Sequence, residues 1–284
     1  MDDPAGERTL TTPPAPPAPL IPDGLDATLV LVRHGQSTFI VEGRFQGQAE
    51  TPLSPTGRRQ AALAGRRLAW PHDPPALPVP SGPPIELVHS PLQRTTQTAE
   101  AIEDALRAAG MTIAGRPDPA FLEIGQGEWE GLHRTEIDAR YARELSAWRQ
   151  RPLETWAPGG ESLTEVQARV RPGLAAVLAR LGVGRPPGSP DRPQVAGYDD
   201  AVPDHPWSIV VGHDGVFKVA MLTLFDLPLD RFWMWSMDLC GISVIELRAG
   251  RPVLRAHNLT AHLGGLPDDD AQAELEERNR SGAL

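Results

Sequence analysis

Runs of apolar residues that end in glycine or polar residues mark the strands of this chain. The run at 28–33 contains Leu29-Val30-Leu31-Val32 and is followed by His34 and Gly35. Four consecutive apolar side chains, two of them β-branched, predict a strand that is buried on both faces. Similar runs predict strands at 85–89, 208–211, 242–248 and 252–257, with a strand-like stretch at 112–114.

Helical periodicity and start signals separate these runs. Ser54 followed by Pro55 predicts an N-cap and a first helical position, with a helix that continues to about Trp70. Ser90-Pro91 repeats the signal before a helix that reaches about Ala109, and Ser162-Leu163-Thr164-Glu165 has the pattern of a capping box. The other predictions are helices at 134–150, 162–181 and 216–225, and an irregular segment at 39–53.

Strands that alternate with helices predict the α/β class, as a three-layer α/β/α sandwich around a mostly parallel open sheet. We expect one domain over residues 25–265. Residues 1–24 are expected to be a disordered Pro-rich tail, and residues 266–284 an acidic C-terminal tail. Two Pro-rich insertions, at 71–84 and 182–206, are expected on the surface, where they would shape the mouth of a site.

The composition excludes several classes of partner. The net charge of −10 argues against nucleic acid and against an anionic membrane surface. No apolar run approaches the roughly 20 residues that span a bilayer, and the N-terminal residues lack the apolar core of a signal peptide. The single cysteine, Cys240, excludes an intrachain disulfide. These features together predict a cytoplasmic protein.

Polar side chains directly follow three of the predicted strands. Arg33-His34-Gly35 follows the first strand, Gly212-His213-Asp214-Gly215 follows strand 208–211, and Arg94 lies in the first turn of the helix after strand 85–89. Because the carboxyl ends of parallel strands meet at one edge, we expect the two histidines and these arginines to converge there. Guanidinium groups suit a tetrahedral oxyanion such as phosphate.

These residues belong to a series of motifs that resembles the histidine phosphatase superfamily, also called the phosphoglycerate-mutase-like family. The motifs are Leu31-Val32-Arg33-His34-Gly35-Gln36-Ser37, Arg44-Phe45-Gln46-Gly47, Ser90-Pro91-Leu92-Gln93-Arg94-Thr95, Leu122-Glu123-Ile124 with Gly127-Glu128-Trp129-Glu130-Gly131, and Gly212-His213-Asp214-Gly215. One Arg-His-Gly triplet is a weak signal, whereas five motifs in the family's order are specific. The resemblance implies a phosphoglycerate-mutase-like fold over residues 28 to about 262.

The resemblance also implies a function, namely a phosphomonoester hydrolase that acts through phosphohistidine on a small phosphorylated metabolite. It makes His34 the nucleophile and Glu123 the proton donor to the leaving group. Arg33, Arg94 and His213 would bind the phosphoryl group as part of the catalytic machinery. The other implied phosphate- or substrate-binding residues are Arg44, Gln36, Ser37, Gln46 and Gly47. Neither a metal nor a cofactor is implied, because arginines supply the positive charge.

Two other functions fit the same motifs. A mutase-type isomerase would pass the phosphoryl group to a second hydroxyl of the substrate, and a non-catalytic module would only bind the phospho-ligand. The Leu-Glu-Ile motif with Gly-x-Trp-Glu-Gly resembles the phosphatase branch, and the separated Arg140 and Arg143 do not resemble the arginine pair of the mutases. Both histidines, the arginines and an acid are present, which argues against a module that only binds.

Several other chemistry-bearing residues have a structural interpretation. Asp214 stands where the family often has glycine, and its carboxylate would weaken phosphate binding if it pointed into the site. His257 and His262 are five residues apart, which fits neither a helix face nor a strand face, so no metal pair is expected. Trp233 and Trp235 fit either the core or the contact surface of a homodimer, and we favour the core.

Overall fold

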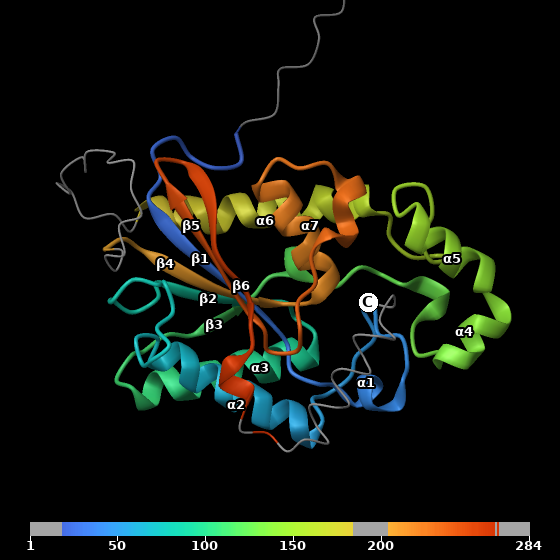
Figure 1. Ribbon diagram of the computed structural model, residues 1–284, viewed down its shortest axis with the longest axis horizontal. Coiled ribbons are helices and arrows are strands. Elements are labelled where there is room, and N and C mark those ends of the chain that lie inside the picture. Colours follow the sequence, from blue (N-terminus) through green and yellow to red (C-terminus); the bar gives the residue numbers. More distant parts are fainter. Residues whose placement is uncertain (1–18, 184–203, 265, 267–284) are drawn as a thin grey trace, which may run out of the picture.

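A six-stranded sheet in the order β3-β2-β4-β1-β5-β6 runs through the structure (Figure 1). This computed structural model describes residues 19–183, 204–264 and 266. The strands are β1 (Ala27–Arg33), β2 (Glu86–His89), β3 (Gly115–Pro117), β4 (Trp207–Gly212), β5 (Ile242–Arg248) and β6 (Arg251–Leu259). The α-helices are α1 (Thr38–Glu42), α2 (Pro55–Ala69), α3 (Gln93–Ala108), α4 (Arg134–Arg140), α5 (Ala142–Gln150), α6 (Leu163–Val183) and α7 (Asp214–Leu224). Short 3₁₀ helices are η1 (Pro119–Phe121), η2 (Gly127–Trp129), η3 (Leu229–Met234) and η4 (Ala261–Leu263).

The sheet is mixed but mostly parallel. Strands β3, β2, β4 and β1 pair in parallel, whereas β5 is antiparallel to β1 and β6 is antiparallel to β5. Helices α6 and α7 cover one face of the sheet, and α2 and α3 cover the other (Figure 1). The predicted α/β/α sandwich is therefore confirmed.

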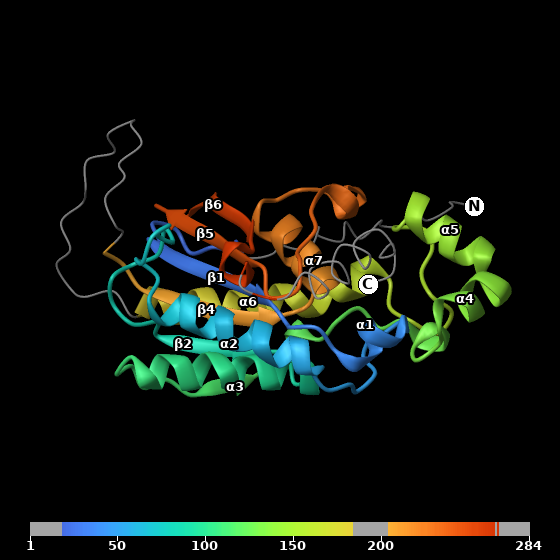
Figure 2. The ribbon, with the colours of Figure 1, turned by 60° about the horizontal axis from the view of Figure 1, so that its bottom comes forward.

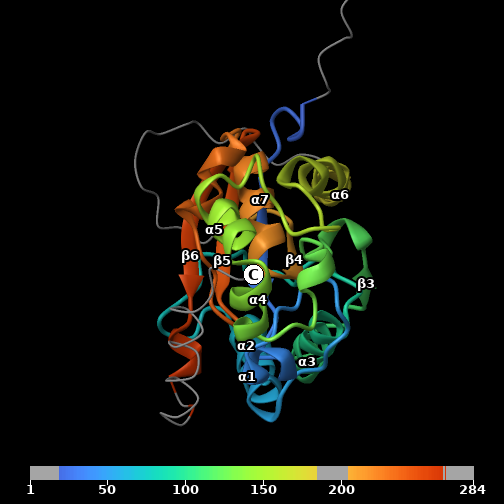
Figure 3. The same cartoon turned by 90° about the vertical axis from the view of Figure 1, so that its right-hand side faces the viewer.

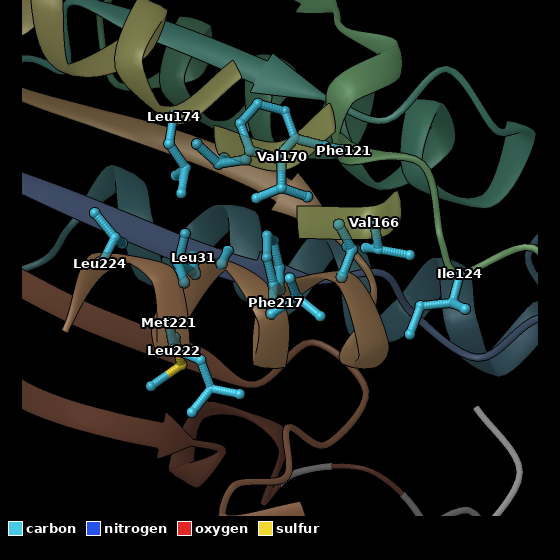
Figure 4. Close-up of a cluster of buried hydrophobic side chains, with 14 of the residues drawn as sticks. Leu31, Phe121, Ile124, Val166, Val170, Leu174, Phe217, Met221, Leu222 and Leu224 are labelled. Atoms are coloured by element: carbon cyan, nitrogen blue, oxygen red, sulfur yellow. The ribbon is translucent and has the colours of Figure 1, made fainter. Parts of the chain in front are cut away.

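Strand β1 shows why the apolar runs have no polar alternation. Leu29 and Leu31 belong to the core on the side of α6 and α7, whereas Val30 and Val32 belong to the core on the side of α2 and α3. Figure 4 shows Leu31 among side chains from α6 and α7. Both faces of the strand are buried, so each position from Leu29 to Val32 carries an apolar side chain before the strand ends at Arg33.

Some element boundaries differ from the predictions. Residues expected to be irregular include the short helix α1, which begins because the Ser37 side chain accepts a hydrogen bond from the amide of Ile40. The helix predicted to start at the Ser90 cap begins instead after Leu92, with no side-chain cap. The helix predicted at 134–150 is divided into α4 and α5 at Tyr141.

Two further elements shift, and the boundaries of the remaining predicted elements agree within two residues. The strand expected at 112–114 is β3, three residues further along the chain. Helix α7 begins at Asp214, two residues before its predicted start. The capping box before α6 is confirmed, because Ser162 and Glu165 exchange the expected side-chain-to-backbone hydrogen bonds.

The Pro-rich insertion at 71–84 packs against the amino ends of the strands. Its Leu77 and Val79 are buried in the core on the side of α2 and α3, and Trp207 at the start of β4 donates to the carbonyl of Gly82 at 2.7 Å. The expectation that this insertion shapes the mouth of the site is therefore wrong, because the site lies at the opposite ends of the strands. Most of the second insertion, together with residues 1–18 and 267–284, lies outside the described residues.

The packed domain begins before its predicted start at residue 25. Leu20 and Ile21, which were assigned to the N-terminal tail, pack against the core as partly buried side chains. Trp233 and Trp235, predicted to belong to the core, also pack against it as partly buried side chains. No helix within the described ranges is long and apolar enough to cross a membrane.

Helices α4 and α5 project beyond the carboxyl ends of the strands (Figure 2). Figure 3 looks onto this end, with α4 and α5 in front of the sheet. Trp148 of α5 packs against Phe232 and Trp233 of η3, with ring centroids 5.5 and 5.8 Å apart. We call residues 132–160, which carry α4 and α5, the cap segment.

The close contact between the loop after β1 and the start of α2 provides a test of the fold. A Cβ atom on Gly57 would overlap the carbonyl oxygen of Gln36, whereas a Cβ on Gly82 would meet nothing within 4 Å. We expect Gly57→Ala to lower the free energy of unfolding by about 2–3 kcal/mol, and Gly82→Ala to leave it nearly unchanged. Chemical denaturation measures both, and equal stabilities would contradict the described contact.

Candidate active site

The carboxyl ends of three parallel strands bring distant polar residues together. Arg33 at the end of β1 is in register with Gly212 at the end of β4, and the amide of His34 donates to the carbonyl of Gly212 at 3.0 Å. The amide of Ser90, just after β2, donates to Val211 of β4 at 3.0 Å. The predicted convergence at this edge is therefore confirmed.

His34 and His213 lie side by side, with ring centroids 5.0 Å apart in an edge-to-face arrangement. Nδ1 of His34 lies 2.7 Å from the carbonyl oxygen of Gly35. Because a carbonyl can only accept, Nδ1 carries the hydrogen and Nε2 keeps its lone pair. Burial, followed by the charges of Arg94 and Arg33, lowers the pKa of His34 well below its usual value. The ring is thus a neutral imidazole near neutral pH.

His213 is also fully buried, and it is the N-cap residue of α7. Its Nε2 lies 2.9 Å from the hydroxyl oxygen of Ser90, while its Nδ1 has no hydrogen-bond partner among the described residues. Burial and the nearby Arg94 lower the pKa of His213 well below its usual value. Sequence analysis treated Ser90 as a helix cap and missed its contact with the histidine, although the residue stands in a quoted motif.

Two arginines supply positive charge beside the histidines. Arg94 is fully buried, and its Nη1 and Nη2 donate to the carbonyls of Ala49 and Gly47 at 3.0 and 2.7 Å. Burial lowers the pKa of Arg94 to about 10, so the guanidinium remains charged at neutral pH. Arg33 is almost completely buried, and its Nη1 donates to the carbonyl of Met237 at 2.7 Å.

Glu123 lies against the first turn of α7. Its Oε1 accepts hydrogen bonds from the amides of Ile124 and Val216 at 2.9 Å each, and its Oε2 accepts one from Gly215 at 3.2 Å. Burial raises the pKa of Glu123 above its usual value, and the negative charge of Asp214 acts in the same direction. A buried carboxyl whose pKa is raised can hold a proton for transfer.

A network that sequence analysis missed fixes the segment before Glu123. Arg169 of α6 donates to the carbonyls of Leu122 and Glu123 at 2.9 and 2.8 Å, and its Nε lies 2.8 Å from an oxygen of Glu161. Gln48 also donates to the carbonyl of Glu123, at 3.0 Å. No local spacing connects these residues, because only the fold brings α6 against the segment.

Glu130 performs a similar task for Arg94. Its Oε1 accepts hydrogen bonds from the amides of Gln48 and Gln126 at 2.9 Å each. These bonds tie two loops together around Gly47, whose φ of +49° and lack of a Cβ fit the tight space beside Glu130. Since the carbonyl of Gly47 accepts a hydrogen bond from Arg94, Glu130 fixes the loop that positions the guanidinium.

Four other predicted ligands make hydrogen bonds within the loops. Gln36 accepts from Ser54 at 2.7 Å, and Gln46 accepts from Ser37 at 2.5 Å. Arg44 is partly exposed, and it donates to Glu42 at 2.8 Å and to the carbonyl of Gly131 at 2.7 Å. The hydrogen bonds described for these side chains hold the loops, and none of them joins the histidine pair.

The remaining acids and histidines near this edge have partners of their own. Asp214 points to Lys218, with Oδ2 and Nζ 2.6 Å apart. The spacing of four residues within a helix was a signal for this pair. His257 contacts the hydroxyl of Ser243 at 3.0 Å, and His262 contacts the carbonyl of Cys240 at 3.1 Å. Within the described part of the chain, no group of three or more His, Cys, Asp or Glu side chains could hold a metal ion.

A neutral histidine whose Nε2 keeps its lone pair, a second histidine, two buried arginines and a buried carboxyl with a raised pKa are groups that can together transfer a phosphoryl group. The histidine phosphatase superfamily (branch 1) matches residues 29–184 and 194–260 of this sequence. The chain therefore belongs to this superfamily, and it is a phosphatase, a hydrolase of phosphoric monoesters.

Characterised relatives span most of the chain. Phosphoserine phosphatase 1 from Hydrogenobacter thermophilus is 28% identical over 237 residues, which are 83% of this chain and 94% of the relative. Glucosyl-3-phosphoglycerate phosphatase from Mycobacterium tuberculosis is 34% identical over 201 residues, which are 70% of this chain and 76% of the relative. A mycobacterial glucosyl-3-phosphoglycerate phosphatase solved with VO3 aligns at a TM-score of 0.63 and 30% identity, covering 82% of this chain and 99% of that one.

The two neutral histidines should make stability depend on pH. An unfolded histidine has a pKa near 6.5, whereas burial lowers the pKa of His34 and His213 well below that value. As the pH falls from about 7.5 to about 5.5, the unfolded chain binds protons that the folded chain does not, which costs about 1 kcal/mol of stability per histidine. Glu123, whose pKa is raised, acts in the opposite sense and reduces the total.

The variant His213→Gln isolates one of these contributions. Its free energy of unfolding should fall by about 1 kcal/mol less than that of the wild type over the same pH range, because the contribution of Glu123 is common to both proteins. Denaturant unfolding at the two pH values measures the difference. An equal fall in both proteins would mean that His213 titrates as it does in the unfolded chain.

Proposed function

We propose that this phosphatase acts in two steps through a phosphohistidine at His34, on the monoester of a small phosphorylated metabolite. The proposal rests mainly on the hydrogen bond from Nδ1 of His34 to the carbonyl of Gly35. Because the hydrogen is on Nδ1, Nε2 has a lone pair that can attack phosphorus. A neutral nitrogen can attack phosphorus without first losing a proton. The names of the relatives, phosphoserine phosphatase and glucosyl-3-phosphoglycerate phosphatase, support the substrate class.

In the first step, Nε2 of His34 forms a bond to phosphorus while the bond from phosphorus to the ester oxygen breaks. Glu123 gives its proton to the departing oxygen, which leaves as an alcohol. Charge spreads over the three equatorial oxygens in such a transfer, and Arg33, Arg94 and His213 are the donors that would stabilise it. The buried positions of these side chains support this role, because they need no rearrangement as the charge develops.

In the second step, water replaces the alcohol. Its oxygen bonds to phosphorus, the phosphorus–nitrogen bond breaks, and the Glu123 carboxylate takes a proton from the water. Inorganic phosphate then leaves and both side chains return to their starting states. The raised pKa of Glu123 suits both directions of this proton transfer.

The same proposal covers the setting in which the enzyme works. The arginines supply the charge, so the reaction is proposed to need neither a metal nor another cofactor. The net charge of −10 and the single cysteine support an enzyme that acts in the cytoplasm without a nucleic-acid partner. In the cap segment, Arg140 ends α4 and stacks on Tyr141, whereas Arg143 lies in α5. Their separation supports hydrolysis rather than a mutase reaction, which needs an arginine pair for a carboxylate.

Replacing the proposed nucleophile tests the mechanism. The variant His34→Ala should lose all turnover of phosphoserine, of phosphoglycerates and of p-nitrophenyl phosphate, because no other group forms the covalent intermediate. Wild-type enzyme quenched during turnover of a ³²P-labelled substrate should carry acid-labile, base-stable label that the variant lacks. EDTA should change neither result.

The matched control is His72→Ala, which removes an exposed histidine in the insertion at 71–84. This variant should keep wild-type turnover and label. Substantial hydrolysis by pure His34→Ala protein would refute the assignment of the nucleophile. Transfer of the label to a second hydroxyl of the substrate, instead of its release as inorganic phosphate, would identify the wild type as a mutase.

The proton donor is tested by changing the leaving group. An alkyl alkoxide needs a proton in the transition state, whereas nitrophenolate hardly does, and general acid catalysis contributes about 10²–10⁴ in rate. The variant Glu123→Gln should therefore lose about 10²–10⁴ in kcat with phosphoserine and far less in the burst of nitrophenol from p-nitrophenyl phosphate. The control Glu128→Gln changes an exposed acid and should leave both rates unchanged. Equal losses with both substrates would place the acid elsewhere.

A further inference from the structure

A buried ion pair next to the second histidine has no place in the proposed chemistry. Lys218, the only lysine of the chain, is 4% exposed, and Asp214 is 8% exposed. Their charged atoms lie 2.6 Å apart on consecutive turns of α7. The ammonium also lies 5.3 Å from the ring of Phe232 and 5.1 Å from that of Trp233. The pair therefore occupies a confined position between α7 and η3.

A buried ion pair of this kind contributes little net stability to a fold. Removing two charges from water costs several kcal/mol per ion, and well-packed apolar residues of similar size often serve at least as well. Lys218 lies against two aromatic rings, on which a long apolar side chain could also pack without the cost of removing a charge from water. The charge of Asp214 must therefore be explained by what this carboxylate holds.

Asp214 reaches the phosphate-binding arginine through one residue. Its Oδ1 accepts a hydrogen bond from the amide of Met237 at 2.8 Å, and the carbonyl of Met237 accepts one from Nη1 of Arg33 at 2.7 Å. Met237 is 2% exposed, so solvent does not compete for these bonds. The first turn of α7 thus fixes the residue whose carbonyl fixes Arg33.

The segment that follows Met237 is also attached to the end of β1. The amide of Arg33 donates to the carbonyl of Gly241 at 3.2 Å, and the amide of Cys240 donates to the carbonyl of His34 at 3.2 Å. We call residues 237–241 the strap. The strap connects the start of α7 to Arg33 and His34, and Asp214 is its attachment at the α7 end.

Holding the strap with a carboxylate has an electrostatic cost. Asp214 directly follows His213 and acts on Glu123 as a negative charge. An unpaired carboxylate there would repel an incoming phosphate and attract Arg33 away from it. Lys218 lies on the side of Asp214 that faces the aromatic rings of η3, where it can neutralise the carboxylate without contacting the strap.

We propose that Asp214 and Lys218 are positioning residues for the proposed phosphatase reaction, on which this inference rests. Asp214 holds Met237 and thereby orients the guanidinium of Arg33 toward the phosphoryl group. Lys218 cancels the charge of Asp214, so that the site keeps its full affinity for a dianionic oxyanion. Neither side chain contacts the substrate.

A set of variants separates charge from hydrogen bonding. Lys218→Met keeps the packing against Phe232 and Trp233 but leaves the carboxylate unpaired. Asp214→Asn/Lys218→Met restores neutrality and keeps an oxygen acceptor for the amide of Met237. Asp214→Ala/Lys218→Met is also neutral but lacks that acceptor. Dissociation constants for vanadate and for inorganic phosphate, from calorimetry near neutral pH, give the readout, with kcat and KM for p-nitrophenyl phosphate alongside.

The proposal predicts a specific order of affinities. Lys218→Met should bind vanadate about ten-fold more weakly than the wild type or worse. Asp214→Asn/Lys218→Met should return to within about three-fold of the wild type, because the unpaired charge is gone. Asp214→Ala/Lys218→Met should stay about ten-fold weaker, since Arg33 loses its support. The exposed pair of Asp104 and Arg107 on α3 supplies the matched control, and Asp104→Asn/Arg107→Met should bind like the wild type.

The results that would overturn the inference are distinct from failure of the proposed function. Wild-type affinity in Lys218→Met would show that the charge of Asp214 does not reach the site. If Lys218→Met does not fold, the two neutral double variants decide, and equal affinities in them would remove the role of the Met237 hydrogen bond. The proposed mechanism would instead be refuted if the wild type bound neither vanadate nor phosphate, or if the His34→Ala variant kept full activity.

Discussion

The burial of the Arg94 guanidinium is the constraint on which the rest of the site depends. A positive charge removed from water needs acceptors on its hydrogen-bonding atoms, and the carbonyls of Gly47 and Ala49 supply them. Those carbonyls are held in place by Glu130, which fixes the loop from a third segment of the chain. The same charge helps to keep both histidines neutral, so the arrangement of Arg94 determines their chemical form as well.

The other side chains of the proposed site are also positioned by hydrogen bonds to residues that are not themselves proposed to bind the phosphoryl group. Arg169 donates to the carbonyl of Glu123, the carbonyl of Met237 accepts from Arg33, and the hydroxyl of Ser90 contacts Nε2 of His213. These three partners come from different segments of the fold, and they hold a backbone carbonyl, a guanidinium nitrogen and a ring nitrogen, respectively. Preorganised donors and acceptors of this kind avoid the reorganisation that water would need around a phosphoryl group. The stability of the domain and the geometry of the site therefore depend on the same hydrogen bonds.

The sheet and the pairing of His34 with His213 could be predicted from the sequence, but few of the hydrogen bonds that position the site residues could. Buried strands such as β1 can be recognised in the sequence because both of their faces contact the core, which gives a continuous apolar run. The motifs that follow the parallel strands then lie at the same edge of the sheet. The contact of Arg169 with the carbonyl of Glu123 and that of Glu130 with the amide of Gln48 were not predictable, since the partners lie on distant segments. Helix α3 was predicted to begin at the Ser90 cap, because a serine before proline is a strong local signal, but the helix begins after Leu92 and the Ser90 hydroxyl contacts His213 instead.

The cap segment has a consequence for how such enzymes diversify. Residues 132–160 leave the domain after η2 and return to it before α6, and none of the residues proposed to handle the phosphoryl group lies between those points. An exchange of this single stretch in a gene would therefore leave every one of those residues in place. A replacement stretch would have to reproduce the contacts of Trp148 with η3 and the burial of Ile137, Leu145 and Ala157 in the shared core, which limits how freely the segment can change.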